Sequence, residues 1–331
     1  MIVTRTPLRI SLGGGGTDLP FYCSKFGSSL ITAAINKYIY ITVGNRVEKS
    51  IKLNYSKTEI VDSVSEVQHP LIREALRLTG IKDSIEIHSI ADIESGTGLG
   101  SSSSFLIGLL KALYYFKGEV VSKYKLAEDA SYITMNVLKE PTGKQDQYAA
   151  AFGNLIHLKI NTKGKVMVSP INITYNNLKK LERDLMMFYT GIKRDAIIVL
   201  QDQKDKSENK SKSDIFDYYH EIKKIGKDSL KFLEKGNLRR FGEWMNVHWE
   251  LKRNITDKMS NPEIDRWYKI ALENGAIGGK IIGAGGGGFL LLYVENNHDR
   301  IKSLMEKEGL IKTNFKFDFD GSKIVYDGKH F

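Results

Sequence analysis

The sequence predicts an α+β fold in two parts, and three observations support this. Strand-like runs dominate the first hundred residues, whereas long helical patterns occupy most of the stretch from 194 to 274. These strands and helices are mixed without the strict alternation of a doubly wound sheet. A chain of 331 residues is also long enough for two cores. We therefore expect a boundary near residue 180, with an N-terminal domain at 1–180 and a C-terminal domain at 181–331.

The elements of the N-terminal domain follow from residue type and apolar spacing. Runs rich in β-branched and aromatic residues predict strands at 1–12, 38–45, 49–56, 84–92, 155–160 and 166–171. Apolar residues at helical spacing predict helices at 102–116 and 122–139. A polar stretch at 174–184 then leads to the C-terminal domain.

The C-terminal domain is expected to start with a strand at 185–191. Helical patterns follow at 194–234, 238–253 and 262–274, then a strand at 287–294 and a final helix–strand pair.

The composition is that of a globular protein, with 41% hydrophobic and 27% charged residues. No apolar run reaches the roughly 18 residues of a membrane span, and the N-terminus lacks the pattern of a signal peptide. Cys23 is the only cysteine, so nothing indicates an oxidising compartment. We expect a cytoplasmic protein without a membrane partner; the sequence does not specify an oligomeric state, and a homodimer stays open.

The formal net charge of +10 raises the question of a nucleic-acid partner. The densest basic cluster, at 202–228, interleaves acids with the bases, which is typical of a solvated helix face. The sequence therefore argues against nucleic-acid binding, although the positive charge would suit a phosphorylated substrate.

Glycine-rich loops are the most informative features. The first, PLRISLGGGGTDLPFY (7–22), follows a strand that carries Arg9. Four successive glycines indicate a backbone that passes close to a ligand or to another segment. Gly15, Gly16, Thr17 and Asp18 are candidate substrate-binding residues, because a carboxylate there could accept hydrogen bonds from substrate hydroxyls. Asp18 could equally cap a turn or helix.

The second loop, SGTGLGSSSSF (95–105), joins a strand pattern to an apolar helix. Free N–H groups and the helix dipole at such a junction favour an anion, and glycines let a phosphate approach the backbone. The loop lacks the lysine of a Walker A motif. The candidate phosphate-binding residues are Gly96, Thr97, Gly98, Leu99, Gly100, Ser101 and Ser102.

The third loop is GGKIIGAGGGGFLLLYV (278–294), in which Gly283, Gly285 and Gly288 satisfy GxGxxG. A dinucleotide fingerprint should precede a helix, but a strand pattern follows here, so we reject that interpretation. The loop could instead close over the ligand of another loop, with Gly285 and Gly286 as candidate substrate contacts.

A fourth stretch, EPTGKQDQYAAAFGN (140–154), places Lys144 two residues before Asp146. A carboxylate beside a cation is suited to deprotonating a hydroxyl. Alone, such a pair is more typical of a surface ion pair.

Together the four stretches resemble the motifs of the GHMP kinases, in order and spacing, from about residue 3 to 295. The form GGGGTDLP resembles that of the bacterial D-glycero-D-manno-heptose 7-phosphate kinases and, more distantly, the fucokinases. The resemblance implies an N-terminal domain like ribosomal protein S5 domain 2 and a ferredoxin-like C-terminal domain, with ATP and substrate between them.

The resemblance also implies residue roles. Gly96 to Ser102 would bind the ATP phosphates, with Ser102 as a Mg²⁺ ligand. Asp146 would be the catalytic base, assisted by Arg9 and Lys144 as cations. Asp18 would hold sugar hydroxyls, and Gly283 to Gly288 would support the phosphate loop or the substrate.

One position departs from the family pattern. Relatives usually carry a glutamate that completes the magnesium site where this chain has Thr134. Glu128 is rotated by roughly 120° from Thr134 on a helix, so it cannot replace that glutamate. We expect Mg²⁺ to be required but weakly held, with Ser102, ATP and Asp146 as its contacts.

The resemblance implies in-line transfer of phosphate from ATP to the anomeric hydroxyl of a sugar phosphate, D-glycero-D-manno-heptose 7-phosphate. L-fucose or another sugar phosphorylated at the same position is an alternative. A non-catalytic ATP or sugar sensor, which Thr134 alone favours, and an RNA-binding protein are the alternatives of other classes. Lys193, Arg194, Lys252 and Arg253 are candidate partners of a substrate phosphate, or simply exposed charges.

Overall fold

The computed structural model confirms the α+β class and describes residues 1–193, 196–208 and 213–328. In the described part, the first sheet has eight strands: β1 (Ile2–Gly13), β2 (Ser28–Asn45), β3 (Ile51–Asn54), β4 (Thr58–Val61), β5 (Ile85–Ala91), β6 (Leu155–Ile160), β7 (Val166–Pro170) and β12 (Lys323–Asp327). The second sheet contains β8 (Leu185–Tyr189), β9 (Gly278–Ile281), β10 (Phe289–Tyr293) and β11 (Ile311–Lys312).

The strand β2 organises the first sheet. It is 18 residues long, pairs with β1 along most of its length, and pairs with β5 at one end and β6 at the other. The sequence analysis predicted only its second half. Residues 28–35 are buried without the alternation of a half-exposed strand, so their sequence gives no period-two signal.

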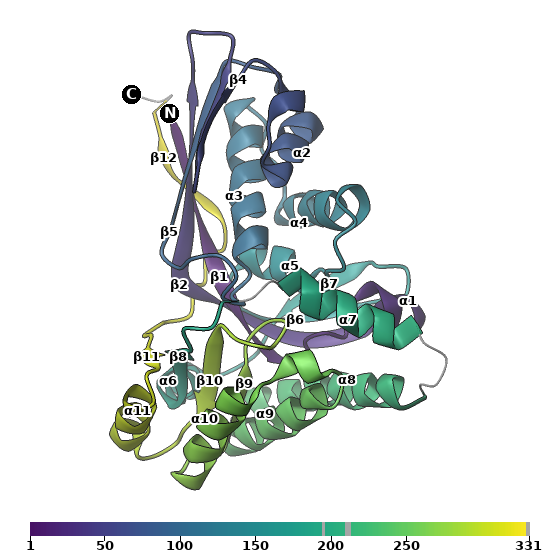
Figure 1. The fold of residues 1–331 in the computed structure, drawn as a ribbon, viewed down its shortest axis with the longest axis vertical. Coiled ribbons are helices and arrows are strands. Elements are labelled where there is room, and N and C mark those ends of the chain that lie inside the picture. Colours follow the sequence, from purple (N-terminus) through teal and green to yellow (C-terminus); the bar gives the residue numbers. More distant parts are fainter. Residues whose placement is uncertain (194–195, 209–212, 329–331) are drawn as a thin grey trace.

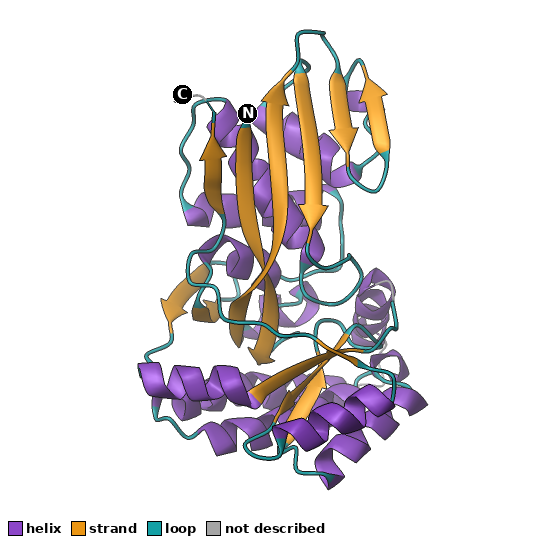
Figure 2. Cartoon of the chain, turned by 90° about the vertical axis from the view of Figure 1, so that its left-hand side faces the viewer, coloured by secondary structure: helices purple, strands orange, loops and turns teal. Residues whose placement is uncertain are grey.

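Helices cover one face of the first sheet, as Figure 2 shows. The helices that precede the second sheet in the chain are α1 (Pro20–Phe26), α2 (Pro70–Thr79), α3 (Ser101–Phe116), α4 (Lys123–Ser131), α5 (Gln145–Phe152) and α6 (Tyr175–Asp184), of which α6 lies beside β8 of that sheet (Figure 1). A π-helical turn, Tyr132–Val137, continues α4, and α6 occupies the polar stretch for which no element was predicted.

The helix α3 is fixed on β1 near the glycine-rich loop that precedes it. Its segment Phe105–Leu113 is almost entirely buried, which explains why this run of apolar residues has no polar face. At its first turns, the Ser104 hydroxyl donates to the Pro7 carbonyl (2.8 Å) and the Thr4 hydroxyl donates to the Gly108 carbonyl (3.0 Å). The start of α3 is thereby held beside the strand that carries Arg9.

The helices of the second half are α7 (Ala196–Glu208), α8 (Ser213–Glu234), α9 (Leu238–Arg253), α10 (Pro262–Glu273) and α11 (His298–Lys307). The helices α9, α10 and α11 pack against the second sheet in the lower half of Figure 1, whereas α8 lies between α9 and the strand β2. Its strands pair antiparallel in the order β11-β8-β10-β9. The predicted helix at 194–234 corresponds to the two helices α7 and α8.

The C-terminal end of the chain returns to the first sheet, where β12 pairs antiparallel with β1 (Figure 1). The sequence analysis did not anticipate this return. The predicted boundary near residue 180 falls within α6, just before β8 begins the second sheet. As a division into domains it stays a prediction.

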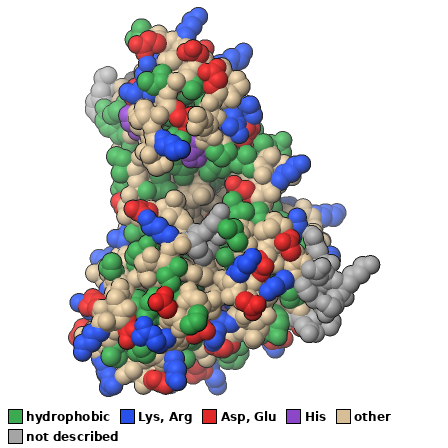
Figure 3. Space-filling model, viewed as in Figure 1, with side chains coloured by type: hydrophobic (Ala, Val, Ile, Leu, Met, Phe, Trp, Pro, Cys, Tyr) green, Lys and Arg blue, Asp and Glu red, His purple; other side chains and the backbone are tan. Residues whose placement is uncertain are grey.

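Charge is mixed over the face shown in Figure 3, where basic and acidic side chains alternate. In the lysine-rich segment at 202–228, Lys206 pairs with Asp202 (3.7 Å) and Lys224 with Glu221 (3.7 Å). None of the helices in the described part is long and apolar enough to cross a bilayer.

Candidate active site

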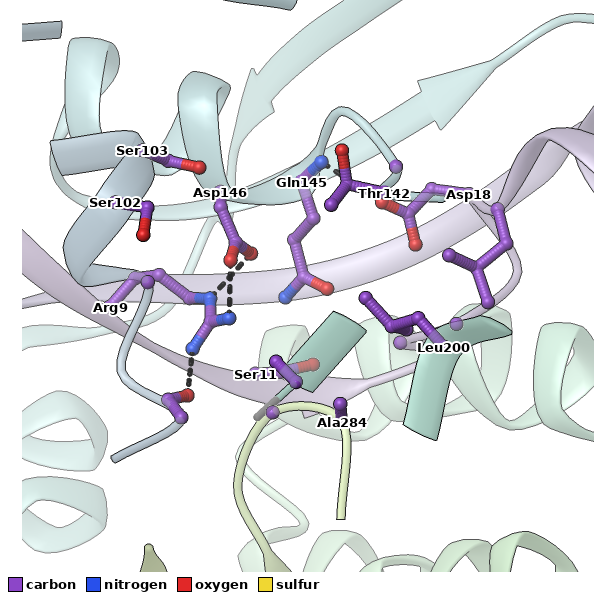
Figure 4. A pocket seen from close by; sticks show the side chains of 18 of the residues that line it. Arg9, Ser11, Asp18, Ser102, Ser103, Thr142, Gln145, Asp146, Leu200 and Ala284 are labelled. Carbon is purple, nitrogen blue, oxygen red and sulfur yellow. Dashed lines mark hydrogen bonds and ion pairs between the residues drawn. The ribbon is translucent and has the colours of Figure 1, made fainter. Parts of the chain in front are cut away.

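A cavity of about 350 Å³ lies where the loops of the first sheet meet the second. Its lining comes from β1 and the loop after it, the loop before α3, the loop before α5, the helix α7, and the segment that contains β9. Figure 4 shows Arg9 and Asp146 facing each other on one side, and Asp18 on the other side beyond Gln145 and Thr142.

Arg9 and Asp146 form a two-pronged ion pair. The Nε and a terminal nitrogen of Arg9 each donate to one oxygen of Asp146, both at 2.6 Å. The other terminal nitrogen of Arg9 donates to the Gly98 carbonyl at 2.6 Å, and the Arg9 amide donates to the Leu99 carbonyl at 3.0 Å. The Arg9 side chain is only 6% exposed, so one buried guanidinium joins the carboxylate to the loop before α3.

This glycine-rich loop has the geometry expected of a phosphate cradle. Gly96, Gly98 and Gly100 all have positive φ angles, and α3 begins at Ser101, directly after them. Ser102 is exposed at the first turn of α3 and lines the cavity. The free N–H groups of this turn are therefore turned to a position beside Asp146.

Two of the seven predicted phosphate-binding residues have side chains that point elsewhere. Leu99 is fully buried in the core, and the hydroxyl of the buried Thr97 donates to the Glu94 carbonyl (3.0 Å). Neither residue is among those that line the cavity. Their side chains anchor the loop.

The third glycine-rich loop, within 278–294, packs against this cradle. A Cβ atom at Gly283 would lie 2.7 Å from the Gly98 carbonyl oxygen, and one at Gly288 would lie 2.1 Å from that of Thr97. Both glycines therefore permit backbone contact between the loops. Gly285 packs against Met259, and the Gly286 amide donates to the Met259 carbonyl at 2.6 Å. Neither residue lines the cavity, so their expected contact with substrate is not met.

Asp18 lies at the far side of the cavity. It is 7% exposed, and one of its oxygens accepts a hydrogen bond from the Gln145 amide at 3.0 Å. Burial raises the pKa of Asp18, and the Asp146 carboxylate raises it further, against backbone hydrogen bonds that lower it. Gly15 and Gly16 line the cavity as expected, whereas the buried Thr17 hydroxyl donates to the Gly14 carbonyl (2.7 Å) and holds the turn.

Lys144 is not brought to Asp146. Its ammonium lies 2.8 and 2.7 Å from the two carboxylate oxygens of Glu128 and donates to the Gly164 carbonyl at 2.9 Å. It lines a separate cavity on the other side of the loop. Lys144 is the residue directly before α5, so its side chain leaves the backbone in a different direction from that of Asp146 in the first turn of the helix. Arg9 takes the place beside Asp146 that was expected for both cations.

Ser102 is the expected magnesium contact that stays available, because both oxygens of Asp146 accept hydrogen bonds from Arg9. The Thr134 hydroxyl donates to the Ala130 and Ser131 carbonyls (3.1 and 3.2 Å). Glu128 bonds to Lys144 and Tyr148, so it is not free to replace the family's glutamate. In the described part of the chain no three His, Cys, Asp or Glu side chains gather at one point. The residues thus fit a cation held chiefly by nucleotide phosphates and the Ser102 hydroxyl, with few protein ligands.

Several polar residues of the cavity were missed by the sequence analysis. The Ser11 and Thr142 hydroxyls and the Gln145 side-chain nitrogen are buried in the cavity wall without a hydrogen-bond partner in the described structure. Such groups are costly unless a ligand satisfies them. Ser11 follows Arg9 by two residues on β1, so strand alternation was a signal that could have identified it.

The residues predicted as partners of a substrate phosphate lie at different places in the structure. Lys193 pairs with the exposed Glu94, and Arg253 pairs with Glu250 (3.2 Å) and Asp265 (3.0 Å) on the surface. Arg194 lies outside the described residues. Lys252 lines the cavity, together with Lys280, which was not considered.

Comparisons with known proteins agree with this geometry. Residues 65–154 match the family "GHMP kinases N terminal domain", and residues 229–308 match "GHMP kinases C terminal". The chain is 30% identical to a D-glycero-alpha-D-manno-heptose 7-phosphate kinase from Campylobacter jejuni, over 97% of this chain and 98% of that protein.

Two solved structures are also similar. One is a D-glycero-D-manno-heptose 1-phosphate kinase from Bacteriodes thetaiotaomicron, with a TM-score of 0.81 and 24% identity over 99% of this chain and 100% of that one. The other is a putative sugar kinase from Campylobacter jejuni, with a TM-score of 0.79 and 28% identity over 98% and 97% of the two chains.

A two-part α+β fold with a glycine cradle beside a carboxylate–arginine pair defines a small-molecule kinase. The chain belongs to the GHMP kinases, ATP-dependent phosphotransferases that act on an alcohol group. The expected family and fold are confirmed.

Proposed function

We propose that this kinase phosphorylates the anomeric hydroxyl of a sugar phosphate, D-glycero-D-manno-heptose 7-phosphate, to give the 1,7-bisphosphate. The heptose 7-phosphate kinase that is 30% identical over nearly both full chains supports this acceptor. The observation that carries the chemistry is the Arg9–Asp146 pair, which lies directly against the loop that would bind the ATP phosphates.

The proposed reaction uses the two sides of the cavity. The sugar hydroxyls bind Asp18, Gln145 and Thr142, and the anomeric hydroxyl is directed at Asp146. Asp146 accepts the proton as the sugar oxygen bonds to the γ-phosphorus and the bond from that phosphorus to the β–γ bridging oxygen breaks.

The positive and dipolar groups of the chain stabilise the transferring phosphoryl group. The Arg9 guanidinium and the N–H groups at Gly100 to Ser102 surround the position where negative charge develops. Mg²⁺ bound with ATP would supply further positive charge, with the Ser102 hydroxyl as its protein contact. Because the protein offers it few ligands, most of its affinity would come from ATP.

The test is acceptor profiling with ATP and Mg²⁺, using ADP release as the readout and NMR to locate the new phosphate. The panel contains D-glycero-D-manno-heptose 7-phosphate, the unphosphorylated heptose, L-fucose, D-galactose and mevalonate. Highest turnover with the heptose 7-phosphate, with the new phosphate on C1, supports the proposal. Preference for L-fucose would replace the acceptor, and the absence of ADP release across the panel would favour a sensor.

A further inference from the structure

Basic side chains line the part of the cavity that the second sheet contributes. Lys280 lies on β9, and Lys252 and His248 lie four residues apart on α9, so they share one face of that helix. Lys280 is 2% exposed and His248 is fully buried, yet the lysine lines the cavity. We call these three residues the basic cluster.

Two hydrogen bonds between described residues help to hold the cluster in place. The Lys280 Nζ lies 3.2 Å from the Nδ1 of His248. When Lys280 is charged it can only donate, so Nδ1 of a neutral His248 then accepts. The Gly15 backbone lies beside the same imidazole. The Lys252 Nζ donates to the Gly283 carbonyl at 2.9 Å. In the described part of the chain, no carboxylate lies within ion-pair distance of Lys280.

This arrangement is costly without a ligand. Burial, and then the charges of Lys252 and Arg9, lower the pKa of Lys280 well below its usual value. Burial, and then the charges of Lys280 and Lys252, lower the pKa of His248. Among the described residues Lys280 faces the cavity without a carboxylate partner, so it is suited to an anionic ligand, which would supply the missing charge.

The two anions of the proposed reaction need separate contacts. The transferring phosphoryl group has its own contacts at Arg9, Asp146 and the loop before α3. The basic cluster lies between the two sides of the cavity: His248 adjoins Gly15, in the loop that leads to Asp18, while Lys252 donates to Gly283 and the charge of Arg9 reaches Lys280. The cluster is therefore available to a second anion beside the phosphate cradle.

We propose, on the basis of the proposed function, that Lys280 and Lys252 bind the phosphate group that the sugar already carries. Lys280 donates from a position fixed by His248, and Lys252 donates beside it from α9. The two lysines determine specificity, since they favour a phosphorylated sugar over the same sugar with a free hydroxyl.

The test compares heptose 7-phosphate with the unphosphorylated heptose in the full-length protein. Binding is measured by calorimetry without ATP, and kcat and KM are measured with ATP. Lys280→Met is expected to weaken binding of the sugar phosphate by about 10- to 100-fold, the effect of losing a charged hydrogen bond. Binding of the unphosphorylated heptose and the KM for ATP should change little.

Lys269→Met is the matched control, because it removes an exposed lysine that pairs with Glu273 on α10 (3.8 Å). Lys280→Met removes a buried charge and should not lower Tm; if it does not fold, Lys252→Met serves in the same comparison. An equal loss with both sugars, or a fall in kcat without a change in binding, would overturn the proposal and assign the lysine to the transferring phosphoryl group.

The two proposals fail separately. A wild-type protein that binds heptose 7-phosphate through Lys280 but releases no ADP would refute the proposed function and retain the phosphate site. If the wild-type protein phosphorylates heptose 7-phosphate, and Lys280→Met keeps the same preference for it over the unphosphorylated heptose, the proposed function stands and the phosphate site is refuted.

Discussion

The exchange Asp146→Asn tests the role of the carboxylate most directly. Asparagine has almost the same shape, and its one side-chain oxygen can still accept a hydrogen bond from Arg9. It loses the second of the two 2.6 Å contacts and the ability to take a proton from the sugar. The third Arg9 contact, with the Gly98 carbonyl, is independent of the exchange, so the phosphate loop should stay in place.

The structure gives magnitudes for two effects. Loss of general-base catalysis should lower kcat by about 10²- to 10⁴-fold. The lost hydrogen bond between charged groups should lower the free energy of unfolding by about 1.5–3 kcal/mol, because Arg9 is 6% exposed and Asp146 28% exposed. For a chain of this size, each kcal/mol corresponds to a fall in Tm of roughly 2–4 °C or less.

The assay is steady-state ADP release with the acceptor that gives the highest turnover, together with calorimetric titration of ATP and thermal unfolding. The control is Asp129→Asn, which removes a carboxylate of 18% exposure that pairs with Lys125 (2.9 Å) outside the cavity. It should leave kcat intact and lower Tm less than Asp146→Asn, because its partner Lys125 is 51% exposed. A wild-type kcat in Asp146→Asn would refute the assignment, and a loss of ATP binding would show that the carboxylate acts through the loop.

Three further exchanges test the other parts of the site. Asp18→Asn should weaken binding of the sugar by about 10- to 100-fold through loss of a charged acceptor, yet raise Tm at neutral pH. Because the pKa of Asp18 is raised in the folded protein, its stabilising contribution is present below the pKa of the unfolded state and is lost as pH rises through the pKa of the folded state. The higher Tm of the variant should therefore disappear in acid. An equal gain in Tm at all pH values would contradict this. Gly288→Ala places a Cβ atom 2.1 Å from the Thr97 carbonyl oxygen and should raise the KM for ATP. The control Gly309→Ala, at a similar φ with open space around it, should show backbone strain alone. Equal KM values for ATP in the two variants would refute the role of Gly288 in supporting the phosphate loop. Thr134→Glu should increase the affinity for Mn²⁺ in the presence of ATP, measured by electron paramagnetic resonance, and unchanged affinity would show that position 134 is remote from the cation.

The backbone conformation of the glycine-rich loops was predictable from the sequence. Glycines before a serine-rich helix start have few uses other than anion binding, and the structure has that loop with positive φ angles at Gly96, Gly98 and Gly100. The strand after the third glycine loop excluded a dinucleotide site, and β10 follows there as expected. These signals are local because they depend on backbone conformation and on the element that follows.

Only the tertiary structure decided which side chains meet. Asp146 takes its cation from Arg9, 137 positions away in the chain, while its sequence neighbour Lys144 pairs with Glu128. Lys280 and His248 come from different elements, and although Lys280 lies in the third glycine-rich stretch, its sequence did not indicate that the side chain meets His248. Nearness in sequence fixes only the direction in which each side chain leaves the backbone; nearness in space depends on how β1, α5, α9 and β9 pack, and that packing is a property of the whole core.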